Sequence, residues 1–316
     1  MKAYCFGVDL GGTTVKMGLL KTNGVMIERW EIPTRKENNG AAILGDISQQ
    51  IKDKMKERSL TEADIQGIGI GVPGPVLNAG IVNRCVNLGW EVVNVADELE
   101  ELTGFPVVVG NDADVAALGE QWVGSGREYD NIVMITLGTG VGGGVIMNGR
   151  IVPGRNGSAG EIGHMSVVDP ADTDGPCRCG RNGCLELAGS ATGIVKMTNK
   201  RLRESTTPSV LRQMQDVTAK DVLDAAKAGD EMAMIIADRM MTYLAKAASE
   251  IACVFDPDVF VIGGGVSKAG DFLTEGIAER YRSMAFYAVK NTPFILASLG
   301  NDAGMIGAAA LVCKNM

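Results

Sequence analysis

Runs of apolar residues separated by glycine turns follow one another along the chain and predict alternating strands and helices. The first run, residues 3–9, ends at Asp9, and a second run covers residues 15–20. Residues 41–58 carry apolar positions at helical spacing among many charges, which predicts an amphipathic helix. Further strands are predicted at 25–32, 66–72, 105–109, 132–137, 142–147, 258–262 and 293–297. Further helices are predicted at 94–103, from Asn111 onward, and at 188–204, 218–228, 230–255, 270–284 and 302–313.

The arrangement of strand, glycine turn and strand occurs twice, once at the start of the chain and again at 132–147, about 125 residues later. Copies at this distance indicate two related halves rather than a solenoid, whose period is shorter. Strands that alternate with helices imply an α/β protein. No segment rich in proline, serine or charge separates the halves. We therefore expect two lobes joined by a compact hinge, with a cleft between them.

One histidine and three cysteines follow the spacing H-x12-C-x-C-x4-C, and this histidine is the single one in 316 residues. The four residues are His164, Cys177, Cys179 and Cys184. Four nitrogen and sulfur ligands are what a closed tetrahedral zinc site needs. The alternative is a disulfide beside an ordinary polar histidine, which a reducing compartment disfavours. We expect structural zinc in a loop over 164–186, which would fix the flanking carboxylates Glu161 and Glu186.

Glycine turns end the first strand of each predicted half. The first turn reads D-L-G-G-T-T-x-K from Asp9 to Lys16, and the second reads T-L-G-T-G from Thr136 to Gly140. Glycine lets a phosphate approach the backbone and threonine adds a hydroxyl donor, whereas Asp9 could hold hydrated Mg²⁺ or orient the turn. The alternative for each turn is a hairpin without a ligand. A third glycine run, 263–265, follows a strand and would either admit a base and ribose or let a helix pack closely.

Asn111 and Asp112 stand where a helix is predicted to begin. Asn111 could cap that helix, which is its purely structural interpretation. Asp112 would lie in the first turn, where the helix dipole stabilises an ionised carboxylate. A carboxylate at the edge of a cleft suits a general base that accepts a proton from a hydroxyl. Asp114 is interpreted as another charged residue of the first helical turn rather than as a second catalytic residue.

The net negative charge of the chain makes nucleic acid an unfavourable partner. Acidic residues outnumber basic ones, 38 against 30, giving a net charge of −8, which argues against broad nucleic-acid binding. We find neither a signal-peptide pattern nor an apolar run of about 18 residues, so we expect a cytoplasmic protein without a membrane span. The four cysteines outside the metal motif are interpreted as buried small hydrophobic residues. They are Cys5, Cys85, Cys253 and Cys313.

These motifs occur in an order that resembles the ROK family of bacterial repressors, open-reading-frame proteins and kinases. The resemblance rests on D-L-G-G-T-T from Asp9, V-P-G-P from Val72, Asn111-Asp112, L-G-T-G-x-G-G-G from Leu137, E-x-G-H from Glu161 and C-x-C-G-x-x-G-C-L-E from Cys177. It extends to D-A-G-x-x-G-A from Asp302. The cysteine cluster is specific to this family, whereas the glycine turns also occur in other sugar kinases, actin and heat-shock ATPases.

The resemblance implies an α/β, actin-like, two-lobed fold made of duplicated ribonuclease-H-like domains with a zinc-binding loop. We expect a small lobe of residues 1–113, onto which a C-terminal helix at 303–316 packs, and a large lobe of residues 114–302. Because the D-x-G-G-T strand begins at residue 3, we expect no DNA-reading domain before it. The family is usually dimeric or tetrameric, which implies a homodimer here.

The resemblance also assigns roles to positions that match the family motifs. Asp112 matches the catalytic base. The ATP site would comprise Asp9, Gly11, Gly12, Thr13, Thr14, Lys16, Gly138, Thr139, Gly140, Gly264 and Gly265. The sugar site would comprise Gly74, Asn87, Asn111, Asp112, Glu161, His164 and Glu186. The zinc ligands would be His164, Cys177, Cys179 and Cys184.

The function implied is ATP-dependent phosphorylation of a hexose at its 6-hydroxyl, with Mg²⁺ assisting and with zinc in a structural role. The segment Asn87-Leu-Gly-Trp90 resembles the family's glucokinases and favours glucose. The alternatives are a kinase for N-acetylmannosamine, N-acetylglucosamine, fructose or allose, or a catalytically silent sugar sensor. Asp112 and both glycine turns argue against the sensor. A purely structural zinc protein or cytoskeletal actin relative would leave Glu161 and Glu186 unexplained.

Overall fold

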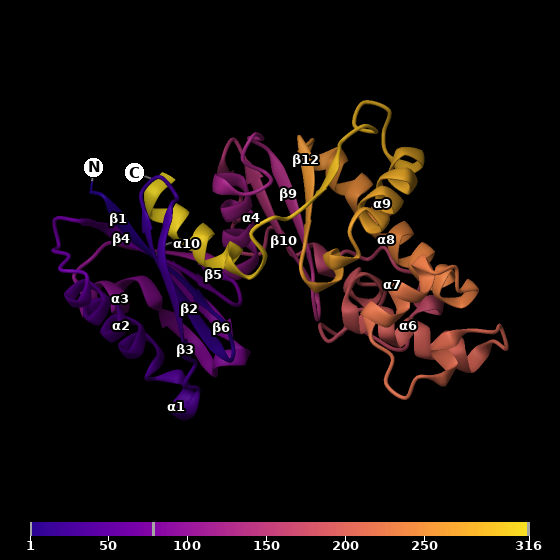
Figure 1. Cartoon of the computed structure of the whole chain (residues 1–316), viewed down its shortest axis with the longest axis horizontal. Helices are drawn as coiled ribbons and strands as arrows, with labels where there is room; N and C mark the ends of the chain where they lie inside the picture. The colour runs from indigo at the N-terminus through magenta and orange to yellow at the C-terminus, as the bar shows by residue number, and fades with distance from the viewer. Residues whose placement is uncertain (1, 78–79, 315–316) are drawn as a thin grey trace. The chain divides into compact units, whose positions relative to one another are not determined.

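A computed structural model describes residues 2–77 and 80–314 of the chain (Figure 1). It divides into two compact units. The first comprises Met1–Asp130, Gly144–Gly160 and Ser298–Met316, and the second comprises Asn131–Gly143 and Glu161–Ala297. The ends of the predicted small lobe, residues 1 and 315–316, lie outside the described residues. No helix among those described is long and apolar enough to cross a membrane.

A five-stranded sheet in the order β3-β2-β1-β4-β8 forms the centre of the first unit. Its strands are β1 (Tyr4–Leu10), β2 (Thr14–Lys21), β3 (Met26–Pro33), β4 (Ile65–Val72) and β8 (Val107–Asn111). The helices of this unit are α1 (Glu37–Gly40), α2 (Ile43–Glu57), α3 (Val95–Thr103), α4 (Asp112–Val123) and α10 (Ala303–Lys314). A small sheet of β5 (Val76–Leu77), β6 (Ile81–Cys85) and β7 (Trp90–Asn94) lies between β4 and α3 in the sequence.

The two faces of the first sheet differ in side-chain size. Helices α2 and α3 pack on the face with large side chains, whereas α10 packs on the face with glycines. Ile68 and Ile70 of β4 share one hydrophobic cluster with apolar residues of α2 and α3. Because strand side chains alternate, the glycines of β4 belong to the opposite face. A side chain at Gly69 would overlap the carbonyl of Ala308, and one at Gly67 would contact Val312. Helix α10 therefore packs against bare backbone, and β1 and α10, from opposite ends of the chain, lie side by side (Figure 1).

The second sheet repeats the first. Its order is β11-β10-β9-β12-β13, and in both sheets an antiparallel hairpin is followed by parallel strands on the other side. Its strands are β9 (Ile132–Leu137), β10 (Val141–Met147), β11 (Arg150–Ile151), β12 (Val259–Gly263) and β13 (Phe294–Leu296). The helices of the second unit are α5 (Glu186–Gly189), α6 (Ala191–Glu204), α7 (Ala219–Lys227), α8 (Glu231–Phe255) and α9 (Asp271–Met284). The predicted duplicated α/β architecture is confirmed.

The structure departs from the predicted elements in a few places. The helix predicted at 188–204 is wrong as a single helix, because Ser190 is extended and ends α5. Its hydroxyl accepts a hydrogen bond from Gly193 N at 2.9 Å and caps α6. The short strands β5, β6, β7 and β11 were not predicted. Short 3-10 turns occupy Val86–Leu88, Ile162–His164, Pro170–Asp172, Val210–Gln213, Gly265–Ala269 and Gly300–Asp302.

A buried carboxylate joins α4 to the segment where the chain re-enters the first unit. Glu120 is 0% exposed and accepts hydrogen bonds from the backbone N–H groups of Ser298 and Leu299 at 2.9 and 2.7 Å. The backbone N–H of Ser125 donates at 2.9 Å, and the hydroxyls of Ser125 and Ser298 each lie 3.1 Å away. This carboxylate thereby satisfies polar groups that would otherwise be buried without a partner.

We expect Glu120→Ala to lower the free energy of unfolding by about 3 kcal/mol, because it leaves several buried donors unsatisfied. Urea denaturation of both proteins measures the change. Glu128→Ala is the matched control, since the Glu128 side chain is 78% exposed, and it should leave the midpoint unchanged. Equal midpoints for Glu120→Ala and the unaltered protein would contradict the assigned role.

Candidate functional site

The predicted nucleotide and catalytic residues of the first unit gather at one edge of its sheet. Strands β1, β4 and β8 are parallel, and their registers place Asp9 beside Gly71 and Gly71 beside Gly110. The carboxyl ends of the three strands are therefore aligned. The glycine turn after β1, the Pro-Gly-Pro turn after β4 and the N-terminus of α4 all leave the sheet at this edge.

The turn from Gly11 to Thr14 is closed by its own backbone and by Thr34. Gly11 N donates to Thr14 O at 3.0 Å, whereas Thr34 donates from its hydroxyl to Gly11 O at 2.7 Å and from its N–H to Thr13 O at 2.9 Å. These bonds satisfy the carbonyls on both sides of Gly12. A Cβ at Gly12 would lie 3.9 Å from Cβ of Asn87, so the predicted sugar ligand Asn87 lies beside this turn.

Asp9 and Lys16 lie opposite each other on β1 and β2. Lys16 Nζ is 3.7 Å from Asp9 Oδ2 and donates to Asn301 O at 3.2 Å. Burial raises the pKa of Asp9 above its ordinary value, and the Lys16 ammonium opposes that rise. A Cβ at Gly304 would lie 2.8 Å from Cγ of Asp9, so Asp9 also faces the first turn of α10.

The N-terminus of α4 is fixed by Asn111. Its Oδ1 accepts from Ala113 N at 2.9 Å and from Asp114 N at 3.4 Å, and its Nδ2 donates to Gly74 O at 3.0 Å. The predicted cap is therefore present, and it holds the turn that contains Gly74. Asp112 is exposed in the first helical turn, where its Oδ1 accepts from Ala113 N at 2.9 Å. The helix dipole favours the ionised form of such a carboxylate.

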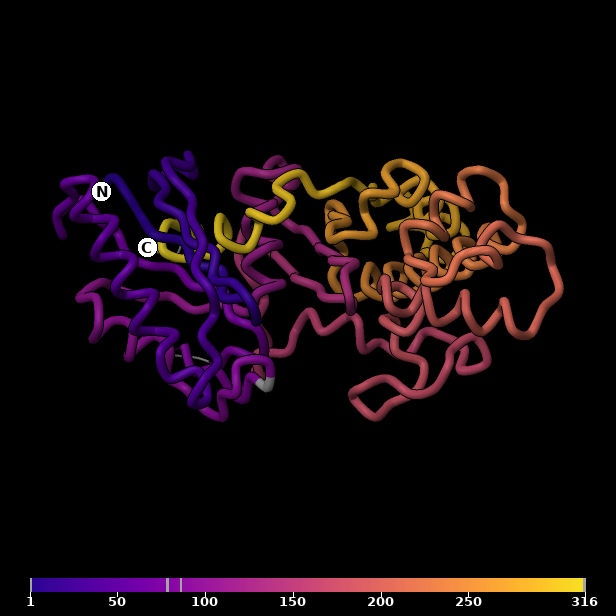
Figure 2. Tube along the Cα trace, turned by 60° about the horizontal axis from the view of Figure 1, so that its bottom comes forward, coloured from indigo at the N-terminus to yellow at the C-terminus, as the bar shows by residue number. Residues whose placement is uncertain are grey.

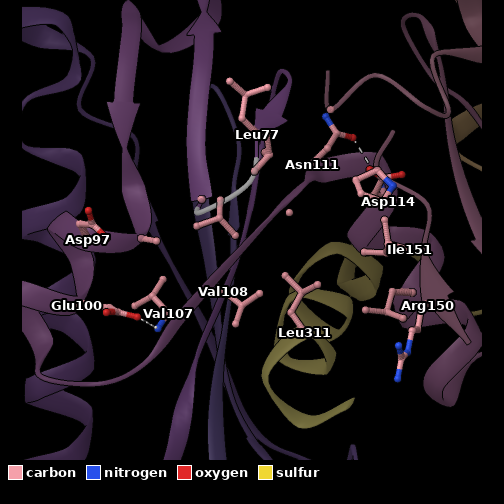
Figure 3. A pocket seen from close by; sticks show the side chains of 18 of the residues that line it. Leu77, Asp97, Glu100, Val107, Val108, Asn111, Asp114, Arg150, Ile151 and Leu311 are labelled. Carbon is pink, nitrogen blue, oxygen red and sulfur yellow. Dashed lines mark hydrogen bonds between the residues drawn. The ribbon is translucent and has the colours of Figure 1, made fainter. Parts of the chain in front are cut away.

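Asn111 also lines a cavity of about 530 Å³ in the first unit (Figure 3). Its wall combines apolar residues of β8, such as Val107, with Arg150 and Asp114. Asn111 is the one predicted site residue among those that line it. Asp112 does not line it, so this cavity is not the site that would place a hydroxyl against Asp112.

The glycine turns of the second unit lie side by side at the ends of β9 and β12. Gly138 N donates to Gly140 O at 3.0 Å, and Gly138 O accepts from Ala191 N at 2.8 Å, at the start of α6. Gly264 has a φ of 84°, and a side chain there would overlap the backbone of Leu137. Gly264 is therefore a close-packing point against the end of β9, whereas a side chain at Gly265 would meet no atom within 4 Å.

The four predicted zinc ligands come together. One ligand atom from each of His164, Cys177, Cys179 and Cys184 can be chosen so that all four lie within 4.8 Å of one another. His164 Nδ1 is 3.7 Å from Cys177 Sγ, and the Sγ atoms of Cys179 and Cys184 are 3.6 Å apart. Bonds to zinc of about 2.0 to 2.3 Å would put tetrahedral ligand atoms roughly 3.4 to 3.8 Å apart. The donor set and its spacing therefore fit zinc.

The backbone folds tightly around this cluster. Cys177 N donates to Arg181 O at 2.8 Å and Gly180 N donates to Cys177 O at 2.9 Å. Gly180 and Gly183 have φ of 84° and 76°, a region where glycine is favoured because it lacks Cβ. These two glycines turn the loop so that the thiols of Cys179 and Cys184 meet.

The two carboxylates flanking the loop contact its ligands on different sides. His164 Nε2 lies 3.9 Å from Glu161 Oε2, so the two ring nitrogens face the thiols and a carboxylate respectively. The Cys177 thiol donates to Glu186 Oε1 at 2.8 Å. A Cβ at Gly140 would lie 3.0 Å from Glu186 Oε2. Glu186 therefore connects the cysteine cluster to the glycine turn after β9.

The surroundings of the three thiols shift their pKa values in different directions. Burial raises the pKa of the Cys177 thiol, as does its hydrogen bond to Glu186. Burial likewise raises the pKa of the Cys184 thiol, whereas the backbone of Arg181 lowers the pKa of Cys179. A divalent cation at the centre would reverse the two increases, because it favours the thiolate form.

The zinc ligands lie together in the second unit, whereas the predicted ATP residues and the predicted sugar residues are each divided between the two units. The first unit holds Asp9, Gly11, Gly12, Thr13, Thr14, Lys16, Gly74, Asn87, Asn111 and Asp112. The second unit holds Gly138, Thr139, Gly140, Glu161, His164, Glu186, Gly264 and Gly265. Two residues of the site were not predicted from the sequence. Thr34 belongs to no motif. Gly304 belongs to the D-A-G-x-x-G motif, which could have indicated its close contact with Asp9.

Comparison with known proteins identifies the family. The sequence profile of the ROK family matches residues 5–315. The chain belongs to the ROK family. It is 43% identical over 311 residues to a glucokinase of Halalkalibacterium halodurans, covering 97% of this chain and 94% of that protein. It is 37% identical over 318 residues to a glucokinase of Thermotoga maritima, covering 98% of each.

A solved ROK structure has the same fold. The crystal structure of a ROK family glucokinase from Streptomyces griseus, in complex with glucose and AMPPNP, is 30% identical to this chain. The superposition has a TM-score of 0.75 and covers 99% of this chain and 100% of the other. The predicted family and fold class are therefore confirmed.

We expect this ROK protein to bind about one zinc per chain and Cys184→Ser to lose most of it, because three ligands leave the site open. Elemental analysis measures the metal, and hydrogen exchange of residues 164–186 measures the order of the loop. Cys253→Ser, at an exposed cysteine, is the matched control and should retain the metal. Full zinc occupancy in Cys184→Ser would overturn the assignment of that ligand.

Proposed function

We propose that this chain transfers the γ-phosphoryl group of ATP to the 6-hydroxyl of a hexose, with glucose as the preferred acceptor. The observation that carries the proposal is the edge shared by Asp9, the turn at Gly11–Thr14 and Asp112. This edge combines a backbone turn suited to phosphate with an exposed carboxylate at a helix start. Full-length similarity to proteins named glucokinase, at 43% and 37% identity, supports a sugar kinase.

Asp112 would act as the general base. It would accept the proton of the 6-hydroxyl while that oxygen attacks the γ-phosphorus in line. Phosphoryl transfer depends mostly on positioning and on stabilisation of charge, so the proton acceptor need only be ionised and correctly placed. Two features of the start of α4 support this role, because the dipole favours the carboxylate and the Asn111 cap fixes the first turn.

The phosphates would be bound by the glycine turns of both units, with Gly11, Gly12, Thr13 and Thr14 in the first unit and Gly138, Thr139 and Gly140 in the second. Gly264 and Gly265 would admit the adenosine. Asp9 and Lys16 would lie next to the phosphates. Mg²⁺, when bound, neutralises charge on the transferring phosphoryl group, and the oxygen-ligand chemistry of Asp9 suits it.

The hexose would be held by acceptors and donors that match its hydroxyls. Asn111, Glu161 and Glu186 offer acceptor oxygens, whereas Gly74 and Asn87 belong to the turns beside them. His164 would bind zinc through Nδ1, which leaves Nε2 to face Glu161 or a sugar hydroxyl. Zinc would then serve the sugar site by fixing the loop and take no part in the transfer.

The second candidate function is phosphorylation of another hexose or of an N-acetylhexosamine. ROK relatives 29% identical to this chain include proteins named N-acetylgalactosamine kinase and beta-glucoside kinase. The ligand set above presents carboxylates and amides that suit several sugars. N-acetylmannosamine, N-acetylglucosamine, fructose and allose therefore stay in the set of acceptors to be tested.

We also propose a cytoplasmic homodimer that binds sugar and ATP and does not bind nucleic acid. Each chain would have a small lobe of residues 1–113, onto which 303–316 pack, and a large lobe of residues 114–302 that carries the zinc loop.

We expect Asp112→Asn to lower kcat by at least about 100-fold, because the amide cannot accept the hydroxyl proton. A coupled assay for ADP release, run over hexoses and N-acetylhexosamines, measures the change and ranks the acceptors. Asp97→Asn is the matched control, since Asp97 lies in the first turn of α3, and it should retain activity. Substantial turnover by a folded Asp112→Asn protein would overturn the assignment of the base.

A further inference from the structure

Two cysteines from opposite ends of the chain meet in a hydrophobic cluster of the first unit. Cys5 of β1 is 0% exposed, and Cys313 lies near the end of α10. Their Sγ atoms are 3.3 Å apart. The surrounding apolar side chains include Leu20, Ile306 and Val312. The sequence interpretation of the four cysteines outside the metal motif as buried small hydrophobic residues did not anticipate this pair, and it is wrong for Cys253, which is exposed.

The contact follows from how α10 lies along β1 (Figure 2). Residues 5, 7 and 9 share one face of the strand because strand side chains alternate. Asp9 faces Gly304, and a side chain at Gly7 would overlap Met305 O and contact Ala309. Helix and strand therefore run in opposite directions in close contact, and that packing brings Cys313 to Cys5. The approach of the two thiols is set by backbone packing.

We propose that Cys5 and Cys313 form a reversible disulfide when the protein meets a peroxide. A disulfide bond measures roughly 2.04 Å, so the sulfurs must approach by about 1.3 Å, which small side-chain rotations supply. This modification lies beyond the hexose phosphorylation proposed above and does not depend on it.

The two thiols differ in a way that assigns their order of reaction. Cys313 is partly exposed and Cys5 is buried. The hydrogen bond between them lowers the pKa of Cys313 and raises that of Cys5, and burial raises the pKa of Cys5 further. Because the thiolate is the nucleophile, Cys313 is the thiol that meets the oxidant and Cys5 is the one that resolves the product.

Hydrogen peroxide is the two-electron oxidant in this reaction. The Cys313 thiolate attacks one oxygen of hydrogen peroxide, the O–O bond breaks, and the other oxygen leaves as hydroxide and takes up a proton to become water. Cys313 is then a sulfenic acid. The Cys5 sulfur attacks the sulfenic sulfur, the S–O bond breaks, and the departing hydroxide takes the Cys5 proton to form a second water. The two thiols supply the two electrons that reduce the peroxide.

The disulfide would join residues 308 positions apart. A cross-link that closes so long a loop restricts the unfolded chain strongly. It would also hold the last turn of α10 against β1. We therefore expect the oxidised protein to unfold at a temperature higher by about 5 °C or more.

The test is treatment of the full-length, zinc-loaded protein with hydrogen peroxide, followed by alkylation and peptide mass mapping without reductant. We expect a cross-linked peptide pair that contains Cys5 and Cys313 and disappears with dithiothreitol. The unfolding temperature should rise on oxidation of the unaltered protein and not on oxidation of Cys313→Ser. Cys313→Ala provides a second variant should the serine disturb folding.

Cys85→Ser is the matched control, because Cys85 is a buried cysteine of the same unit, and it should keep both the cross-link and the rise in temperature. Absence of the Cys5–Cys313 peptide at a peroxide dose that oxidises the exposed Cys253 would overturn the proposal. A cross-link at the cysteines of the zinc loop alone would overturn it as well.

Discussion

The register of three parallel strands is the constraint on which the candidate site of the first unit depends. Asp9 of β1, Gly71 of β4 and Gly110 of β8 lie in one row. The glycine turn, the Pro-Gly-Pro turn and the start of α4 therefore emerge together, although they are separated by tens of residues in the sequence. A slip of one residue in either strand pair would turn Asp9 or Asn111 to the wrong face of the sheet. The backbone pairing of the strands thus sets the positions of the side chains of Asp9 and Asn111.

Electrostatics links the cysteine loop to the proposed chemistry in the second unit. Glu186 accepts from the Cys177 thiol and lies beside Gly140, whereas Glu161 faces the outer nitrogen of His164. Thiols and carboxylates gathered this closely favour a cation among them. A metal there would favour the thiolate forms of the cysteines, and the same residues would then be held in place for a sugar. Zinc and the acceptor site are therefore expected to respond together to mutation.

Features with a local signal could be read from the sequence, whereas features made by distant contacts could not. The apolar run over 66–72 predicted β4, and the spacing of His164 and its cysteines predicted their cluster. Glu120 gave no signal, because a glutamate on a helix ordinarily faces solvent, and its burial depends on a segment about 180 residues later. Ser190 interrupts a pattern that reads as one helix because its side chain caps the next one.

Helix α10 has a consequence for the order in which the protein can be completed during synthesis. The glycine face of β1 and β4 is covered by residues 303–314, which follow the whole second unit in the sequence. Until they are made the first unit holds strands whose bare backbone lies open on one side, while the whole second unit has already been made. The first unit can therefore complete its packing only after the second unit has been made. A nascent chain that stalls before residue 303 would leave the glycine-lined face of β1 and β4 uncovered.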